Sequence, residues 1–308
     1  YTARLLYVFY FGLTFLEFLF LIFAGMPVFD AITTSFSTAG TGGFGIKNDS
    51  LTSYSVSVQW IVTVFMILFG INFNAYYLLF FGNIKKVLEL EEVRYYLGII
   101  LFSVVVISCN IYSMCQGLFD TITKSSFQVA SIITTAGFTT TDFDLWPKTS
   151  QIILVMLMFV GACAGSTGGG IKVSRFVILF KTIFKEFNSY IHPHSVKKIK
   201  MDGKSIEHDV IRSVNVHMIT FIALFAISVF IISFENLDLT TTFTAVATTI
   251  NNVGPGLELV GPTHNFADFS ILSKYVFIFD MIAGRLELFP LLILFHPGAW
   301  KDFFKKSK

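Results

Sequence analysis

The segment Ala164-Gly165-Ser166-Thr167-Gly168-Gly169-Gly170 lies in the middle of an apolar run that extends from Ile152 to Phe184. Glycine costs about 1 kcal/mol relative to alanine inside a helix. An unwound backbone cannot face lipid, because its amide groups would lack hydrogen-bond partners. The segment therefore predicts a break in a membrane helix that lines a cavity or packs against protein. We interpret it as a flexible constriction in a pore.

The composition of the whole chain supports a membrane location. Of its 308 residues, 54% are hydrophobic, 37 are phenylalanine and only 14% are charged. A soluble domain has about a quarter of its residues charged. We therefore predict an all-α integral membrane protein.

Long apolar stretches recur along the chain. A bilayer core needs about 20 helical residues, and the following stretches are expected to cross it: Leu5–Met26, Val56–Phe81, Leu97–Met114, Ile152–Phe159 resumed as Ile171–Phe184 after the glycine segment, Val214–Phe234 and Ile271–Phe295. The connector Lys85–Arg94 is charged, so we expect it to lie in water.

Each pair of spans encloses a shorter segment that leads into a loop of glycine, threonine or asparagine. Phe29-Asp30 and Phe119-Asp120 precede the first two of these segments, and aspartate is a good N-cap residue. A short capped helix followed by such a loop is typical of a re-entrant pore helix and its ion filter. The unit of span, half-helix, loop and span occurs three times, with half-helices at Ala31–Ser37, Ser125–Ile133 and Leu239–Thr249.

The three loops carry the residues that we expect to form a selectivity filter for a monovalent cation. Backbone carbonyls replace the hydration shell of a monovalent cation without a buried charge. Glycine permits the backbone dihedrals that this needs, and the partly negative C-terminal ends of the half-helices favour a cation. No Asp or Glu lies beside these glycines, which disfavours a calcium-type filter. The candidate residues are Thr41, Gly42 and Gly43; Thr134, Thr135, Ala136 and Gly137; and Asn251, Asn252, Val253 and Gly254.

The distribution of basic residues predicts the orientation. With the three filter loops on one side, that side holds four lysines, and the other side holds most of the basic residues, including the cluster 172–212 and the C-terminal lysines. Basic loops face the cytoplasm, so the filters are expected to face outward from a cell (inner) membrane. The basic stretch Asn188–Arg212 either orients the chain or docks a cytosolic partner.

Together these stretches resemble the Trk/Ktr/HKT superfamily of potassium transporters, and most of all the bacterial Trk-type pore subunits. The resemblance is carried by Phe29–Phe44, Gly70–Phe73, Ser131–Asp142 with Leu145-Trp146, Cys163–Lys172, His192-Pro193, Ala245–Gly256 and Gly284–Glu287. It covers nearly the whole chain.

The resemblance implies a pseudo-fourfold pore formed by four repeats of one polypeptide. Each repeat contributes one key filter glycine, here Gly43, Gly137 and Gly254. Three of the four repeats are present, with boundaries expected at 1–82, 83–190 (with an intramembrane gating loop at 161–171) and 191–308. We expect the natural protein to be longer and to have a further repeat before Tyr1.

The resemblance also implies that the glycine-rich break is an intramembrane gate beneath the filter. The gate residues would be Gly165, Ser166, Thr167, Gly168, Gly169 and Gly170 with Lys172 and Arg285. Arg285 would project into the pore, with the freed carbonyls of residues 164–170 as its partners. The alternative for Arg285 is an ion pair with Glu287 or Asp280. The other two second spans, Val56–Phe81 and Ile271–Phe295, are expected to lack such an insertion.

Two transport functions remain open from the sequence. The first is potassium uptake through a gated, carbonyl-lined pore with no organic cofactor. The second is proton- or sodium-coupled potassium symport that uses an intramembrane acid such as Glu17 or Asp280. An enzyme or a sensor is disfavoured, because the sequence has no HExxH motif and no Ser/His/Asp set. Residues 165–172 also lack the Gly-Lys-Ser/Thr ending of a phosphate-binding loop.

Expected partners follow from the same resemblance. They are a second copy in a homodimer, a cytosolic ring of nucleotide-binding regulatory subunits, and membrane lipid, with no nucleic acid. Candidate docking surfaces are Lys85–Arg94, Lys181–Arg212 and the basic C-terminal tail Lys301–Lys308.

Overall fold

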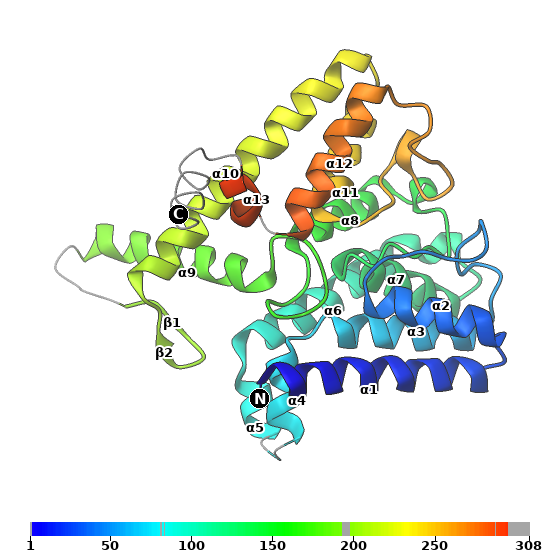
Figure 1. Ribbon diagram of the computed structural model, residues 1–308, viewed down its shortest axis with the longest axis horizontal. Coiled ribbons are helices and arrows are strands. Elements are labelled where there is room, and N and C mark those ends of the chain that lie inside the picture. The colour runs from blue at the N-terminus through cyan, green and yellow to red at the C-terminus, as the bar shows by residue number, and fades with distance from the viewer. Residues whose placement is uncertain (1, 81, 83, 193–197, 287, 295–308) are drawn as a thin grey trace, which may run out of the picture.

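The computed structural model describes residues 2–80, 82, 84–192, 198–286 and 288–294, most of which lie in helices (Figure 1). The α-helices are α1 (Thr2–Phe23), α2 (Val28–Ala39), α3 (Val56–Phe69), α4 (Phe73–Phe80), α5 (Ile84–Glu89), α6 (Glu91–Ile111), α7 (Leu118–Ile133), α8 (Lys148–Val160), α9 (Val173–Ile191), α10 (His208–Ile232), α11 (Leu239–Asn251), α12 (Ile271–Arg285) and α13 (Leu288–Leu294). Four short 3₁₀ segments and one antiparallel hairpin, β1 (Lys200–Met201) with β2 (Lys204–Ser205), complete the described elements.

The helices pack in three similar groups, which confirms the predicted all-α class. In each group a half-helix contacts the helix before it and the helix after it: α2 contacts α1 and α3, α7 contacts α6 and α8, and α11 contacts α10 and α12 (Figure 1). Neighbouring groups also pack through equivalent helices, since α3 packs on α7 and α8 packs on α11. The last helix of one group thus supports the half-helix of the next. We call α2, α7 and α11 the pore helices.

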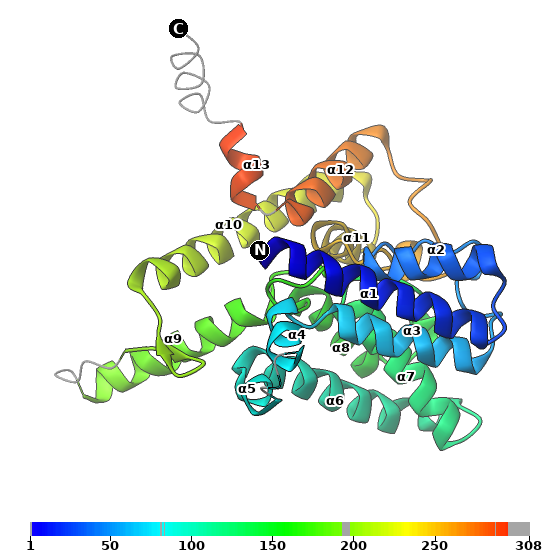
Figure 2. The same cartoon turned by 60° about the horizontal axis from the view of Figure 1, so that its bottom comes forward.

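Within the described chain, α1, α6 and α10 are each long and apolar enough to cross a membrane. The pair α3 and α4 passes the same test together. Large apolar side chains such as Phe11, Phe15 and Phe230 are exposed on these helices. Apolar surface of this extent marks contact with lipid or with another protein. The peripheral helices α9 and α13 extend away from the three groups (Figure 2).

The predicted continuous span Val56–Phe81 is wrong, because the chain bends by 92° between α3 and α4. Gly70 ends α3 where a Cβ atom would lie 2.1 Å from the hydroxyl oxygen of Tyr96. The Asn72 side chain then accepts a hydrogen bond of 2.8 Å from the Asn74 amide and begins α4. A glycine and a capping asparagine therefore interrupt the apolar run.

The last predicted span, Ile271–Phe295, is also divided, since α12 ends at Arg285 and α13 begins at Leu288. Residues 287 and 295 lie outside the described residues. A break therefore occurs in the second long segment of every group. The break in the middle group, residues 161–172, is the longest of the three, so the groups differ in the length of this break and not in its presence.

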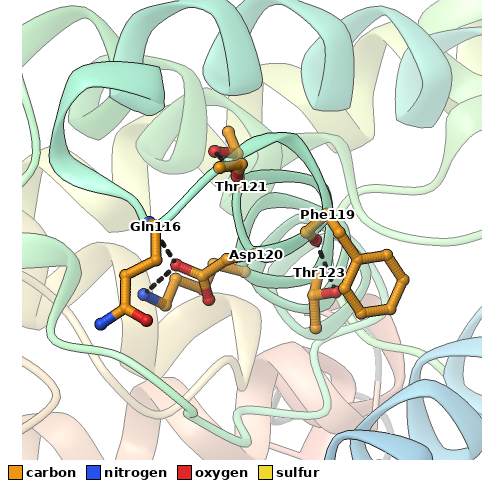
Figure 3. Close-up of polar contacts among 7 residues, drawn as sticks. Gln116, Phe119, Asp120, Thr121 and Thr123 are labelled. Carbon is orange, nitrogen blue, oxygen red and sulfur yellow. Dashed lines mark hydrogen bonds and ion pairs between the residues drawn. The ribbon is translucent and has the colours of Figure 1, made fainter.

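The predicted N-caps Asp30 and Asp120 lie instead in the first turn of their helices. Pro27 and Gly117 occupy the N-cap positions of α2 and α7. Asp120 accepts hydrogen bonds from the Gln116 amide (3.1 Å) and from the Lys124 ammonium (2.7 Å), as Figure 3 shows around the start of α7.

The other two pore helices carry a carboxylate at the same end. The Asp30 carboxylate accepts a hydrogen bond of 2.6 Å from the Tyr54 hydroxyl. Asp238 is a true N-cap and accepts a bond of 2.8 Å from the Thr241 amide. Each carboxylate lies at the positive end of a helix dipole, which stabilises it.

The connector Lys85–Arg94 is only partly in water. Lys85, Lys86 and Arg94 are exposed, as expected for a charged connector. Glu92 and Val93, however, are each only 6% exposed, because they lie in the first turn of α6 and face the protein interior. The prediction that this whole segment is solvated is therefore wrong.

The first-turn carboxylate of α7 gives a testable effect on stability. Partial burial alone would raise the pKa of the Asp120 carboxyl, but the Lys124 ammonium and the Gln116 amide outweigh it and lower that pKa. We expect Asp120→Ala to reduce the free energy of unfolding by about 1 kcal/mol, the usual net contribution of an intramolecular hydrogen bond. The measurement is thermal unfolding of the detergent-purified protein.

The pH dependence and a matched variant check this assignment. A lowered folded-state pKa contributes stability above the unfolded value of about 3.9, and the contribution disappears as pH falls through the folded value. The difference between wild type and Asp120→Ala should therefore shrink below about pH 4. Lys124→Gln, which removes only the side-chain pair, should cost about 0.3–0.5 kcal/mol. Equal losses from the two variants would show that the bond from the Gln116 amide to Asp120 contributes nothing to stability.

Candidate functional site

The three pore helices end in the same backbone conformation. Two residues before each filter glycine, the chain takes a positive φ, at Thr41 (50°), Thr135 (57°) and Asn252 (56°). The glycines follow with φ of 68° at Gly43, 81° at Gly137 and 107° at Gly254. Such angles are rare for residues with a side chain, so their recurrence at matching positions shows that the three loops share one geometry.

A repeated pair of hydrogen bonds fixes this geometry. The amide of the residue before each filter glycine donates back to a helix carbonyl five residues earlier. These bonds are Gly42 to Ser37 (2.8 Å), Ala136 to Ser131 (2.9 Å) and Val253 to Thr248 (2.9 Å). The amide of each positive-φ residue donates three residues back, at 3.1 Å in all three loops. This is the Schellman motif, which pairs the last helix carbonyls.

The filter loops lie against one another at their glycines. A Cβ atom on Gly43 would lie 2.2 Å from the carbonyl oxygen of Ala136. A Cβ atom on Gly137 would lie 2.2 Å from the carbonyl oxygen of Val253. No side chain fits at either place. The three loops are therefore joined one after another, and each contact brings a backbone carbonyl of one loop next to the filter glycine of the preceding loop.

The polar side chains of the predicted filter residues bond to helix carbonyls and hold the loops in place. The backbone carbonyls of the loops remain the candidate cation ligands, as predicted from the sequence. Thr134 donates to the Ala130 carbonyl (2.6 Å), Asn251 to the Ala247 carbonyl (2.8 Å) and Asn252 to the Met281 carbonyl (3.0 Å). Among the described residues there is no group of three His, Cys, Asp or Glu side chains suited to a metal ion.

The glycine-rich break, residues 161–172, lies beside all three filter loops. The Thr167 carbonyl accepts a hydrogen bond of 3.2 Å from the Thr41 hydroxyl. The Gly169 amide donates to the Thr135 hydroxyl at 2.6 Å. A Cβ atom on Gly169 would lie only 2.6 Å from the carbonyl oxygen of Asn251. The break therefore contacts the C-terminal end of every pore helix.

The two predicted cationic neighbours of the loop have different partners. Lys172 donates to the Gly168 carbonyl. Arg285, at the end of α12, donates to the Thr41 hydroxyl (2.9 Å) and the Gly40 carbonyl (2.9 Å). The expectation that Arg285 binds the carbonyls of 164–170 is therefore wrong, because its guanidinium reaches the base of the first filter loop instead.

The predicted alternative for Arg285, an ion pair, is not formed with Asp280. The Asp280 carboxylate is buried and accepts a hydrogen bond of 2.9 Å from the Ser228 hydroxyl. Glu287 lies outside the described residues. Arg285 is thus held at a helix end by two neutral oxygens, and its charge is not neutralised by Asp280.

Two cavities meet at Arg285. One, of about 310 Å³, is lined by Gly165–Gly170, Lys172, Arg175, His217, Phe221, Ile250, Ala283, Gly284, Arg285 and Leu288. The other, of about 710 Å³, is lined by filter-loop residues of the first and third groups, by α12 and by Arg285. Arg285 therefore lines both the space at the filter and the space beside the glycine loop, which is also lined by Lys172 and Arg175.

Sequence reasoning missed the residues that hold the loop from its other side. One Glu92 carboxylate oxygen accepts hydrogen bonds from the amides of Ala164 (2.6 Å) and Ser174 (3.1 Å). The Gly70 carbonyl accepts a bond of 3.0 Å from the Cys163 amide. The only signal for Glu92 was its position where a charged connector becomes apolar, and this does not distinguish a buried acid from a solvated one.

Repeated groups of long helix, pore helix and filter loop define an integral membrane protein of the pore-forming transport class. The sequence model of the TrkH cation transport proteins matches residues 1–302, and the chain belongs to this family. It is a family of transporters and not of enzymes.

Individual relatives agree with this assignment. The chain is 36% identical over 307 residues to the Trk system potassium uptake protein TrkH of Salmonella typhimurium and to that of Escherichia coli K12. The matched region covers 98% of this chain and 63% of the length of each of these relatives. The crystal structure of the potassium transporter TrkH from Vibrio parahaemolyticus superposes with a TM-score of 0.90 at 34% identity, covering 97% of this chain and 65% of that one.

The contact between filter loops predicts a specific sensitivity at Gly137. We expect Gly137→Ala to abolish potassium transport by the complete protein, because the new Cβ atom meets the Val253 carbonyl. The positive φ alone costs about 1–3 kcal/mol for a residue with a side chain. Rubidium tracer uptake into proteoliposomes measures the effect.

Gly25→Ala is the matched control. Gly25 has a φ of 85°, close to the 81° of Gly137, but a Cβ atom on it would meet nothing within 4 Å. This variant carries the same backbone strain without the contact and should transport normally. Normal transport by Gly137→Ala would contradict the tight contact between the loops.

Proposed function

We propose that this protein mediates potassium uptake across the cell membrane through a gated pore lined by backbone carbonyls. The observation that carries the proposal is the glycine-to-carbonyl contact that joins three equivalent filter loops directly above one glycine-rich break. Neutral carbonyl oxygens suit a weakly hydrated monovalent cation. The relatives that are named potassium uptake proteins support the choice of K⁺ as the transported ion.

The filter is proposed to consist of Thr41, Gly42 and Gly43, of Thr134, Thr135, Ala136 and Gly137, and of Asn251, Asn252, Val253 and Gly254. In this proposal their carbonyls coordinate the ion. The side chains of Thr134, Asn251 and Asn252 keep the loops in register, as their bonds to helix carbonyls indicate.

The pore is proposed to have pseudo-fourfold symmetry, with repeats at 1–82, 83–190 and 191–308. Neighbouring groups pack through the same pair of elements, α3 on α7 and α8 on α11. Between the first and third groups lies the cavity of about 710 Å³, which is lined by filter residues of both. Its position supports a fourth filter loop that closes the ring there.

The gate is proposed to be Gly165–Gly170 with Lys172 and Arg285. The loop adjoins the ends of all three pore helices, so an ion that leaves the filter meets it. Arg285 adds a positive charge at the same level, and it repels a cation strongly where little water is present to screen the two charges. Both features oppose conduction until the loop moves.

Membrane location, orientation and partners complete the proposal. The filters face outward from the inner membrane and the basic loops face the cytoplasm. The protein forms a homodimer surrounded by lipid and binds a cytosolic ring of nucleotide-binding regulatory subunits, and no nucleic acid. Lys85–Arg94 and Lys181–Arg212 are the docking candidates, while the third candidate, the tail Lys301–Lys308, lies outside the described residues.

A coupled symporter is the second candidate, favoured by one observation. Glu17 on α1 is fully buried beside Thr38 of the first pore helix. Asp280 is also fully buried, and one of its carboxylate oxygens has no hydrogen-bond partner. Buried acids within membrane segments are typical of the proton relays of transporters. Reversal potentials in proteoliposomes separate the two functions, since an uncoupled pore follows the potassium gradient and ignores pH and sodium.

The gate predicts the effect of shortening the loop. Deletion of Gly168–Gly170 should raise potassium flux through the complete protein several-fold, because the segment that contacts Thr134, Thr135 and Asn251 is removed. Tracer uptake per molecule of protein in the membrane is the measurement. Unchanged or lower flux at normal protein levels would refute the gate.

The positive charge of Arg285 predicts a second increase in potassium flux. Arg285→Ala should also raise flux, since it removes both the positive charge and the two bonds to the first filter loop. Lys148→Ala removes an exposed positive charge from the start of α8 and should leave flux unchanged. Equal flux through the two variants would contradict the role of Arg285 as a barrier.

A further inference from the structure

Glu92 is an ionisable side chain buried beside the glycine-rich break. It belongs to the first turn of α6 and is 6% exposed. Its Oε1 atom accepts hydrogen bonds from the backbone amides of Ala164 (2.6 Å) and Ser174 (3.1 Å). These two amides lie on opposite sides of Gly165–Gly170. One oxygen atom therefore ties together both ends of the loop.

The amide at Ser174 explains why a carboxylate is needed there. Ser174 is the second residue of α9, and the first amides of a helix have no partner inside it. The N-cap residue of α9 is Lys172, whose side chain makes no capping bond to the helix. Glu92 supplies the missing acceptor from another helix. Its negative charge also lies at the positive end of the α9 dipole, where an anion is favoured.

The helix turn that carries Glu92 is anchored on its cytoplasmic side. The Glu91 amide donates to the Asp202 carboxylate of the hairpin at 2.7 Å. Lys181 of α9 forms an ion pair with the Glu91 carboxylate and donates to the Lys200 carbonyl at 2.7 Å. The start of α6, the helix α9 and the hairpin are thus bound together. These contacts fix the position of Glu92 relative to α9. The glycine-rich loop beside it, by contrast, has a backbone with many accessible conformations.

We propose that Glu92 is a positioning residue that keeps the glycine-rich loop in its closed arrangement by capping α9 from α6. The proposal rests on the gating function of that loop. When both amides are bound to Glu92, the loop ends are held together and Gly168 and Gly169 stay under the pore helices. Releasing either amide gives the loop ends freedom to separate, and the backbone of glycine offers little resistance to that motion.

The test is potassium flux through the complete protein in proteoliposomes. We expect Glu92→Ala to raise flux about tenfold, the effect of a change of about 1.4 kcal/mol in the closed-to-open equilibrium. Glu92→Gln keeps a neutral Oε1 acceptor and should raise flux only about twofold to threefold. Asp268→Ala, which removes an exposed acid from the loop before α12, should have no effect.

A double variant shows whether Glu92 acts through the loop. In protein that already lacks Gly168–Gly170, Glu92→Ala should add nothing to the raised flux, because the closed arrangement is gone. A purely structural role for Glu92 predicts instead a lower amount of protein in the membrane and no partial rescue by glutamine. If Glu92→Ala fails to accumulate, Glu92→Gln decides the matter by itself, with unchanged flux overturning the proposal.

The outcomes distinguish this inference from the gate on which it rests. If the deletion raises flux while Glu92→Ala leaves it unchanged or lowers it, the role of Glu92 is overturned and the gate stands. If Glu92→Ala raises flux further in the deletion background, Glu92 does not act through the loop and the proposal is also overturned. If the deletion has no effect, the proposed gate itself is wrong.

Discussion

The structure depends on the approach of one filter loop to the next at a distance that excludes any side chain. Gly43 and Gly137 each lie where a Cβ atom would be 2.2 Å from a carbonyl oxygen of the following loop. Close packing of this kind leaves no freedom to rotate one loop without moving its neighbour. The shared Schellman motifs, the matching positive φ angles and the repeated packing of α3 on α7 and α8 on α11 all serve to keep that approach in register.

Unpaired backbone polar groups are the second constraint, because a membrane interior supplies no water to satisfy them. The backbone amides of the break at residues 161–172 meet this constraint by hydrogen bonding to groups on several neighbouring elements. The Thr135 hydroxyl, the Gly70 carbonyl and the Glu92 carboxylate each accept from an amide of the break. A loop held by several separate partners can be released at one of them without unfolding the rest, which suits a moving element.

Several parts of this arrangement were predictable from the sequence, and others were not. The pore helices, the loops after them and the place of the glycine break follow from local composition, and the structure has all of them. The bend at Gly70 was missed because a single glycine in an apolar run does not distinguish a tolerated glycine from a helix end. The partners of Arg285 were mispredicted because a long side chain at a helix end reaches groups far away in the sequence, here Gly40 and Thr41.

By itself the sequence determined the all-α membrane class, the threefold recurrence of a half-helix with a glycine loop, and the unusual break at Ala164–Gly170. Each of these depends on local hydrophobicity and on the backbone preferences of glycine, which act between near neighbours in the chain. Only the tertiary structure decided that Gly137 faces Val253, that Arg285 binds the first filter loop and that Glu92 is buried against both ends of the break. These contacts join residues of different helices, and their geometry is set by how the helices pack.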